Sequence, residues 1–211
     1  MIKISLKGLA KYMTGTSSQQ RKVLRDFKNP DPEGFAQTIY YRETREFIAA
    51  YHREGHDLNW LQEKATRLFT ISSVMTGQTA ARLRNNALAV QRYASHFGSK
   101  QFEVLDDLRF ALQVGNVRVS LHPDLHVRER GTEKLIKLEF TKDTPDPKLI
   151  RIMTQAMFEA SQEVGLVLPS SAVLYYDVPR GAIHKGARLS ARMSQEISDA
   201  CINIEAIWET L

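Results

Sequence analysis

The sequence contains little that would place the protein in a disulfide-rich, zinc-binding or membrane-spanning class. Its 211 residues include one cysteine, Cys201, so the chain can form no internal disulfide and carries no cysteine-rich zinc site. No apolar run approaches the ~20 residues that a helix needs to cross a bilayer. Lys7 and Lys11 interrupt the apolar residues near the start, so we expect no signal peptide, no membrane contact and a cytoplasmic protein.

Several motifs of nucleotide-dependent and hydrolytic enzymes are also missing. The sequence has no glycine-rich phosphate loop, no Gly-x-Ser-x-Gly elbow and no kinase motif set. The segment 181–186 begins and ends with glycine but lacks the spacing of a phosphate loop. We therefore expect it to be a connecting loop.

Positive charge is concentrated near the start of the chain. The formal net charge is +5 and the isoelectric point is about 9.3, which permits a polyanionic partner. Residues 1–28 contain seven lysine or arginine residues against Asp26 alone, so this segment accounts for the whole excess. We expect Arg21, Lys22 and Arg25 to contact DNA phosphate groups, with an ordinary solvated helix face as the alternative.

The hydrophobic period changes near the middle of the chain. Up to Gly98 the apolar residues recur at helical spacing, and afterwards apolar and polar residues alternate as they do in strands. This change predicts an α/β fold, with a helical N-terminal region (1–98) packed on a core (99–211). The core is predicted to be a small mixed central sheet flanked by helices.

A strand, a helix and another strand follow one another in the second half of this core. The first strand ends near Lys142, the helix carries apolar residues from Leu149 to Val164 on one face, and the second strand covers 172–178. A crossover of this kind predicts parallel pairing between the two strands.

Two acidic residues lie on neighbouring predicted strands. Asp124 follows Pro123 at the start of one segment, and Glu139 lies in the segment 135–142. A hairpin between the segments would bring both carboxylates to one edge of the sheet, where surface carboxylates contribute little to packing. Carboxylate pairs of this kind suit a magnesium ion that keeps several water ligands.

Strand parity predicts which side chains meet, because neighbouring residues on a strand point to opposite faces. A regular strand would leave Asp124 and His126 on one face, and Lys137 and Glu139 share a face of the next strand. Four apolar residues would then share the opposite face of the first strand: Val119, Leu121, Leu125 and Val127.

This pattern resembles the PD-(D/E)XK nuclease superfamily, over roughly residues 102–181. The predicted strand order also matches the common restriction-endonuclease-like core of that superfamily. The resemblance implies a metal-dependent deoxyribonuclease that hydrolyses DNA phosphodiester bonds. It implies that Asp124 and Glu139 bind Mg²⁺ or Mn²⁺, and that Lys137 or Lys142 orients water or stabilises the pentavalent phosphate.

The lysine departs from the pattern of the superfamily. Thr141 occupies the usual lysine position, two residues after the acid. Lys142 needs a strand bulge to reach the site, whereas Lys137 has the right parity but precedes the acid. The third alternative is a site that has decayed and no longer cuts DNA.

Other features of the resemblance are incomplete. Exonuclease-type members related to RecB carry a glutamine and a tyrosine four residues apart on the following helix. Gln155 matches and would support the site, but Glu159 replaces the tyrosine. Such members also complete the metal shell from an earlier helix, where Glu43, Glu46 and His52 are candidates, with ordinary surface residues as the alternative.

Basic residues beside aromatic ones suggest further contacts with DNA. Arg42 and Arg45 follow Tyr41, and the predicted helix ending at Gly98 carries a second polar surface that includes Asn85 and Arg92. A protein partner or a homo-oligomer is also open. The alternative to a nuclease is a catalytically inactive nuclease-fold protein acting as a DNA-binding or assembly subunit, and a third is an interaction protein with no nucleic-acid role.

Overall fold

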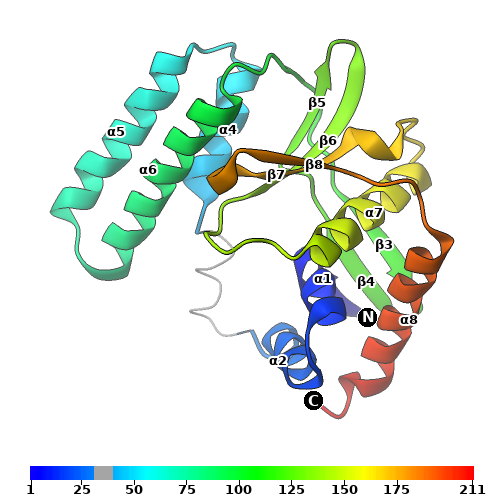
Figure 1. Cartoon of the computed structure of the whole chain (residues 1–211). Helices are drawn as coiled ribbons and strands as arrows, with labels where there is room; N and C mark the ends of the chain where they lie inside the picture. The colour runs from blue at the N-terminus through cyan, green and yellow to red at the C-terminus, as the bar shows by residue number, and fades with distance from the viewer. Residues whose placement is uncertain (31–39) are drawn as a thin grey trace.

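The computed structural model describes residues 1–30 and 40–211. The described strands form two sheets, a three-stranded one in the order β1-β4-β3 and a five-stranded one in the order β2-β5-β6-β7-β8 (Figure 1). Their bounds are β1 (Ile2–Ser5), β2 (Glu103–Val104), β3 (Phe110–Val114), β4 (Val117–Leu121), β5 (Leu125–Glu129), β6 (Thr132–Glu139), β7 (Val173–Asp177) and β8 (Ala182–Lys185). An α/β fold with a mixed sheet and packed helices is therefore confirmed.

The helices pack in two layers around these sheets (Figure 1). One apolar core joins α1, α2, α7 and α8 to the three-stranded sheet and to one face of β6 and β7, and a second joins α4, α5 and α6 to the opposite face of the five-stranded sheet. The helix bounds are α1 (Leu6–Thr14), α2 (Ser17–Lys28), α4 (Arg42–Arg53), α5 (Leu58–Val74), α6 (Gly77–Phe97), α7 (Pro147–Glu163) and α8 (Ala191–Trp208). Helical spacing in the sequence also predicts a helix from about residue 36 to 53, and the start of this predicted helix lies outside the described residues.

The predicted crossover is present. β6 and β7 pair in parallel through α7, with Glu139 directly opposite Asp177 in the register. The helix begins at Pro147, where Asp146 accepts a hydrogen bond from the backbone N–H of Lys148 as its cap. Because the chain has to cross over to return in parallel, β6 and β7 end at the same edge of the sheet.

The prediction that the apolar residues between 119 and 127 share one face of a single strand is wrong. The segment forms two strands, β4 and β5, with a break between them. Val119 lies in the core with α1 and α7, whereas Leu125 and Val127 lie in the core with α4 and α6. Pro123 cannot donate a ladder hydrogen bond, and Asp124 adopts a bend between β4 and β5. The chain leaves the three-stranded sheet at this point and enters the five-stranded one. The apolar side chains before the bend therefore face one core, and those after it face the other.

The strands β1 and β8 form where the sequence pattern predicted none, as does the two-residue strand β2. Ile2–Ser5 pairs in parallel with β4, so the N-terminal segment contributes a strand to the core. Ala182–Lys185 pairs antiparallel with β7, which corrects the expected connecting loop at 181–186. Both strands contain four residues, too few for alternation to stand out in the sequence. No helix in the described part of the chain combines the length and apolarity of a membrane span.

Candidate functional site

Asp124 lies at the bend before β5, enclosed by donors from two elements. Its side chain is 3% exposed, with Oδ1 at 2.8 Å from Arg45 Nε and Oδ2 at 3.0 Å from Lys137 Nζ. Oδ2 also accepts the backbone N–H of Leu138 at 2.7 Å. Leu138 lies opposite the residues just before the start of β5, and the carboxylate of Asp124 accepts its N–H there.

The electrostatic balance around Asp124 keeps the group ionised. Burial raises the pKa of a carboxyl group, but the charges of Lys137 and Arg45 and the Leu138 N–H outweigh it and hold the pKa of Asp124 below its ordinary value. Arg45 also stacks over the ring of Phe140, with Cζ 5.4 Å from its centroid. Arg45 therefore joins α4 to the five-stranded sheet through both Asp124 and Phe140.

Glu139 lies at the end of β6 and is bound from the opposite helical layer. Its Oε2 is 2.6 Å from Lys7 Nζ on α1 and accepts the hydroxyl of Tyr175 at 3.1 Å. Its Oε1 accepts the backbone N–H groups of Phe140 and Thr141, each at 3.1 Å. Burial would raise the pKa of Glu139, but Lys7 and the N–H of Thr141 lower it to about 2.

A second acidic residue lies beside Glu139. Asp177, its partner in the β6–β7 register, is 2% exposed in its side chain and binds Arg180 through both oxygens, at 3.1 and 3.2 Å. Arg180 also donates to the backbone oxygens of Lys142 and Asp143. The acids at the ends of β6 and β7 thus each have their own cation.

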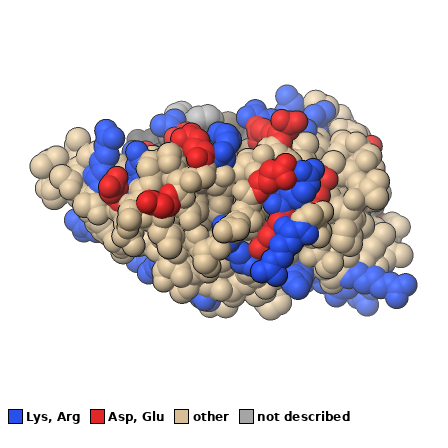
Figure 2. All heavy atoms as spheres, turned by 90° about the horizontal axis from the view of Figure 1, so that it is seen from above, with Lys and Arg blue, Asp and Glu red and all other residues tan. Residues whose placement is uncertain are grey.

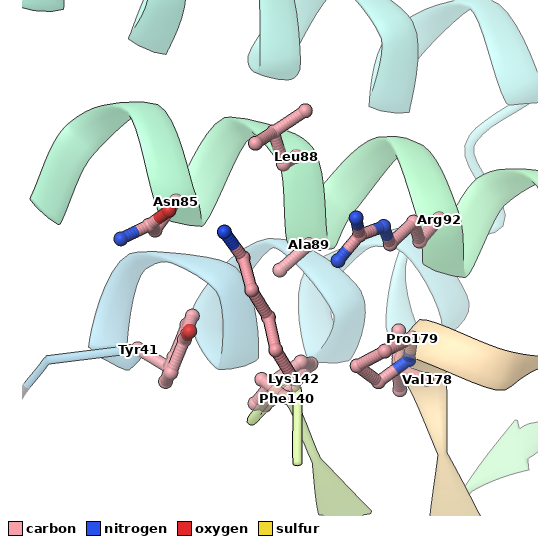
Figure 3. Close-up of a pocket in the computed structure, with 9 residues that line it drawn as sticks. All are labelled: Tyr41, Asn85, Leu88, Ala89, Arg92, Phe140, Lys142, Val178 and Pro179. Carbon is pink, nitrogen blue, oxygen red and sulfur yellow. The ribbon is translucent and has the colours of Figure 1, made fainter. Parts of the chain in front are cut away.

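The two predicted lysines lie apart from Glu139. Lys137 binds Asp124 and the backbone oxygen of His122. Lys142 extends from the end of β6 toward α6, where its amine lies between Asn85 and Arg92 at the wall of a small pocket (Figure 3). The cation that contacts Glu139 is Lys7, which sequence reasoning counted only as part of the basic N-terminal segment.

Gln155 serves a different contact from the predicted one. Its amide nitrogen donates to the backbone oxygen of Ser190, to Ser194 Oγ and to Glu159, at 2.9 to 3.0 Å. Its amide oxygen accepts the N–H of Ser190. Gln155 and Glu159 therefore anchor the start of α8 to α7, and neither hydrogen-bonds to Asp124 or Glu139.

The three candidates for an additional metal ligand have separate partners. Glu43 pairs with Arg82, and Glu46 is solvent-exposed near Arg42. His52 is buried against the hydroxyl of Tyr93, and burial lowers the pKa of His52 to about 4. His52 is therefore neutral at pH 7, and among the described residues none of the three forms a hydrogen bond or ion pair with Asp124 or Glu139.

The predicted DNA contacts divide into exposed and internal residues. Arg21, Lys22 and Arg25 are exposed on α2, and no acidic side chain within residues 1–30 and 40–211 pairs with them. Arg42 is also exposed, 3.6 Å from Glu46. Arg45 is bound to Asp124, which corrects its expected role as a free DNA contact.

The present arrangement leaves a metal ion few free ligand atoms. The described residues contain no group of three His, Cys, Asp or Glu side chains placed around one point. Both oxygens of Asp124 and of Glu139 already accept from cations or N–H groups. Mg²⁺ at Asp124 or Glu139 would place a further cation against carboxylates that Arg45, Lys137 and Lys7 already neutralise. The expectation that the acids contribute little to packing is wrong, because both are buried and paired.

Comparison with known proteins leaves the family open. No protein-family model matches the chain, and a search of curated proteins found no match. The resemblance to the PD-(D/E)XK superfamily stays a prediction that rests on the two acids and the order of the strands.

Proposed function

We propose that the protein binds DNA without cutting it, through basic surfaces on a nuclease-like α/β core. The observation that carries this proposal is the exposed basic face of α2. Arg21, Lys22 and Arg25 reach solvent and pair with no described acidic residue. Cations of this kind supply sequence-independent affinity, because each neutralised phosphate releases condensed counterions.

The pairing of the two acids supports a non-catalytic role. Asp124 and Glu139 bind cations from α4 and α1, which pack on opposite sides of the sheet. The side chains of Asp124 and Glu139 are 3% and 9% exposed and accept from three and four donor groups, and such contacts fasten helices to a sheet. In this proposal the acids stabilise the core, and DNA is bound elsewhere on the surface.

The distribution of charge distinguishes α2 from another face of the protein. Figure 2 shows the molecule from above, where acidic and basic side chains are interspersed, most densely toward the right of the view. That face offers no continuous basic surface for a phosphate backbone. The basic face of α2 carries Asp26 as its one acidic residue, and Asp26 pairs with none of the described cations.

Salt-dependent binding to duplex DNA tests the proposal. Replacing Arg21, Lys22 and Arg25 by glutamine should lower the slope of log affinity against log salt by up to about 3. The matched control replaces three exposed cations on other helices, Arg67→Gln, Arg84→Gln and Lys148→Gln, and should leave most of the slope. Absence of DNA binding by the unmodified protein at low salt, or equal losses in both triple variants, would contradict the proposal.

A metal-dependent nuclease is the second candidate, and one contact favours it. Lys7 Nζ lies 2.6 Å from Glu139, so α1 provides the cation that Thr141 does not. If the protein cuts DNA, Lys7→Gln should lower the cleavage rate by about 10²-fold, whereas Lys142→Gln should have little effect. Circular dichroism should show that both variants are folded.

Cleavage assays also decide between the two candidates. Incubation of the unmodified protein with duplex and single-stranded DNA in Mg²⁺ or Mn²⁺ should leave the DNA intact under the first proposal. Cleavage that is lost in Glu139→Gln would reject the non-catalytic proposal. No cleavage with either ion would reject the nuclease.

A further inference from the structure

A groove lies beside the edge strand β8, away from the basic face of α2. Its volume is about 410 Å³, within the range of sites for small molecules. One wall is the first half of α7, the opposite side is β8, and the loop after β6 closes one end. The groove opens at the edge where the parallel strands β6 and β7 end, which is the edge of α/β sheets where ligands commonly bind.

The charges in this groove are unbalanced. Three cationic side chains, Arg151, Arg180 and Lys185, line it together with one carboxylate, Asp177. Arg180 neutralises Asp177 through both of its oxygens. No acidic side chain in the described part of the chain pairs with Arg151 or Lys185. Arg151 therefore lines the groove without an acidic partner among the described residues. Lys185, at the end of β8, lies between this groove and a second hollow beside Ile183 on the other face of the strand.

The same groove has an apolar portion. Pro145, Pro147 and Ile150 line the side of α7 and its preceding loop, and Ala182 lines the side of β8. An anion bound at Arg151 places an attached ring or short chain against these residues. A fully hydrated inorganic ion would leave this apolar surface exposed, so the lining favours an organic anion.

We propose that this groove binds a small organic phosphate monoester, a dianion attached to a compact apolar group. The phosphate charge complements the net positive charge of the lining residues, and Arg151 supplies planar donors for the phosphate oxygens. Thr144 and His184 line the same groove and add side chains that can donate to phosphate. The proposal does not depend on DNA binding, because α2 takes no part in the groove.

Isothermal titration calorimetry with phenyl phosphate tests the proposal. The unmodified protein should bind phenyl phosphate more tightly than inorganic phosphate, which lacks the ring, and should not bind phenol, which lacks the charge. Arg151→Gln combined with Lys185→Gln should weaken phenyl phosphate binding by at least about tenfold. The control, Lys148→Gln, removes an exposed lysine of the same helix that lies outside the groove and should bind as the unmodified protein does.

The outcomes separate the groove from general attraction to anions. Equal weakening by Lys148→Gln would overturn the proposal, because it would show that overall charge attracts the ligand. Equal affinity for inorganic and phenyl phosphate would overturn the assignment of an organic ligand. No binding of phenyl phosphate by the folded, unmodified protein would overturn the site itself.

Discussion

Asp124 and Glu139 are two buried acids compensated in different ways. Asp124 faces two cations, Arg45 and Lys137, and one backbone N–H. Glu139 faces one cation, Lys7, and three hydrogen bonds from neutral groups. The sequence pattern suggested two equivalent metal ligands, but each acid instead attaches a different helical layer to the sheet. Asp124 does so mainly through charge, and Glu139 through one charge and several neutral hydrogen bonds.

The largest effect is expected where charge compensation dominates. Asp124→Asn keeps the shape of the side chain but leaves Arg45 and Lys137 without an anion. Removing one member of a buried ion pair costs about 3 to 5 kcal/mol. Because Arg45 and Lys137 are 35% and 21% exposed, the free energy of unfolding should fall by the lower end of this range. Urea denaturation measures the loss.

An exposed acid provides the control for Asp124. Asp107 pairs with His122 and Arg109, but its side chain is 59% exposed. Asp107→Asn should therefore change the free energy of unfolding by less than about 1 kcal/mol. Similar losses for the two variants would show that the burial of Asp124 contributes nothing to its effect.

A smaller loss is expected at Glu139. Glu139→Gln retains an amide oxygen for the backbone N–H groups but loses the charge opposite Lys7, whose side chain is 40% exposed and can return to water. We expect a decrease of about 2 to 3 kcal/mol in the free energy of unfolding. A loss equal to that of Asp124→Asn would mean that the neutral hydrogen-bond donors around Glu139 do not reduce the cost of removing its charge.

Acid titration should isolate the contribution of Glu139. Its pKa is about 2 in the folded protein and near 4.5 when unperturbed, so the unfolded chain binds more protons between these values. Stability from this group is complete above about pH 4.5 and is lost as the pH falls toward 2, with a slope of up to about 1.4 kcal/mol per pH unit. Glu139→Gln should show a correspondingly shallower decline when urea denaturation is repeated across this range.

The smallest effect concerns a neutral donor. Tyr175→Phe removes the hydroxyl that donates to Glu139 Oε2, while Lys7 continues to bind that oxygen. The expected decrease in the free energy of unfolding is about 1 kcal/mol, the usual value of one hydrogen bond. A decrease above about 3 kcal/mol would show that Tyr175, and not Lys7, dominates the site.

The sequence predicted the elements whose signals are local. Alternation after Gly98 predicted strands such as β3 and β4, and the apolar spacing of α7 between two strands predicted the parallel pair of β6 and β7. The prediction of which side chains share a face failed at the bend at Asp124, because alternation of side chains assumes an uninterrupted strand. Pro123 was the signal of that interruption, because proline cannot continue a central ladder.

Contacts between distant residues could not be predicted in this way. Lys7 and Glu139 are 132 residues apart, and no local pattern of α1 indicates which of its lysines meets the sheet. Arg45 looked like a surface residue because its helix carries charges on several sides. Its buried partner Asp124 became evident only once the positions of α4 and β5 were known.

The parallel pairing of β1 with β4 has a consequence for the order of folding. Ile2–Ser5 is synthesised before its partner Val117–Leu121, and α1, α2, α4, α5 and α6 lie between the two strands in the sequence. The first strand must therefore wait unpaired while the helical hairpin of α5 and α6, which has local contacts, can form. Completion of the three-stranded sheet, and with it the contact of Lys7 with Glu139, is expected to be a late and slow step of folding.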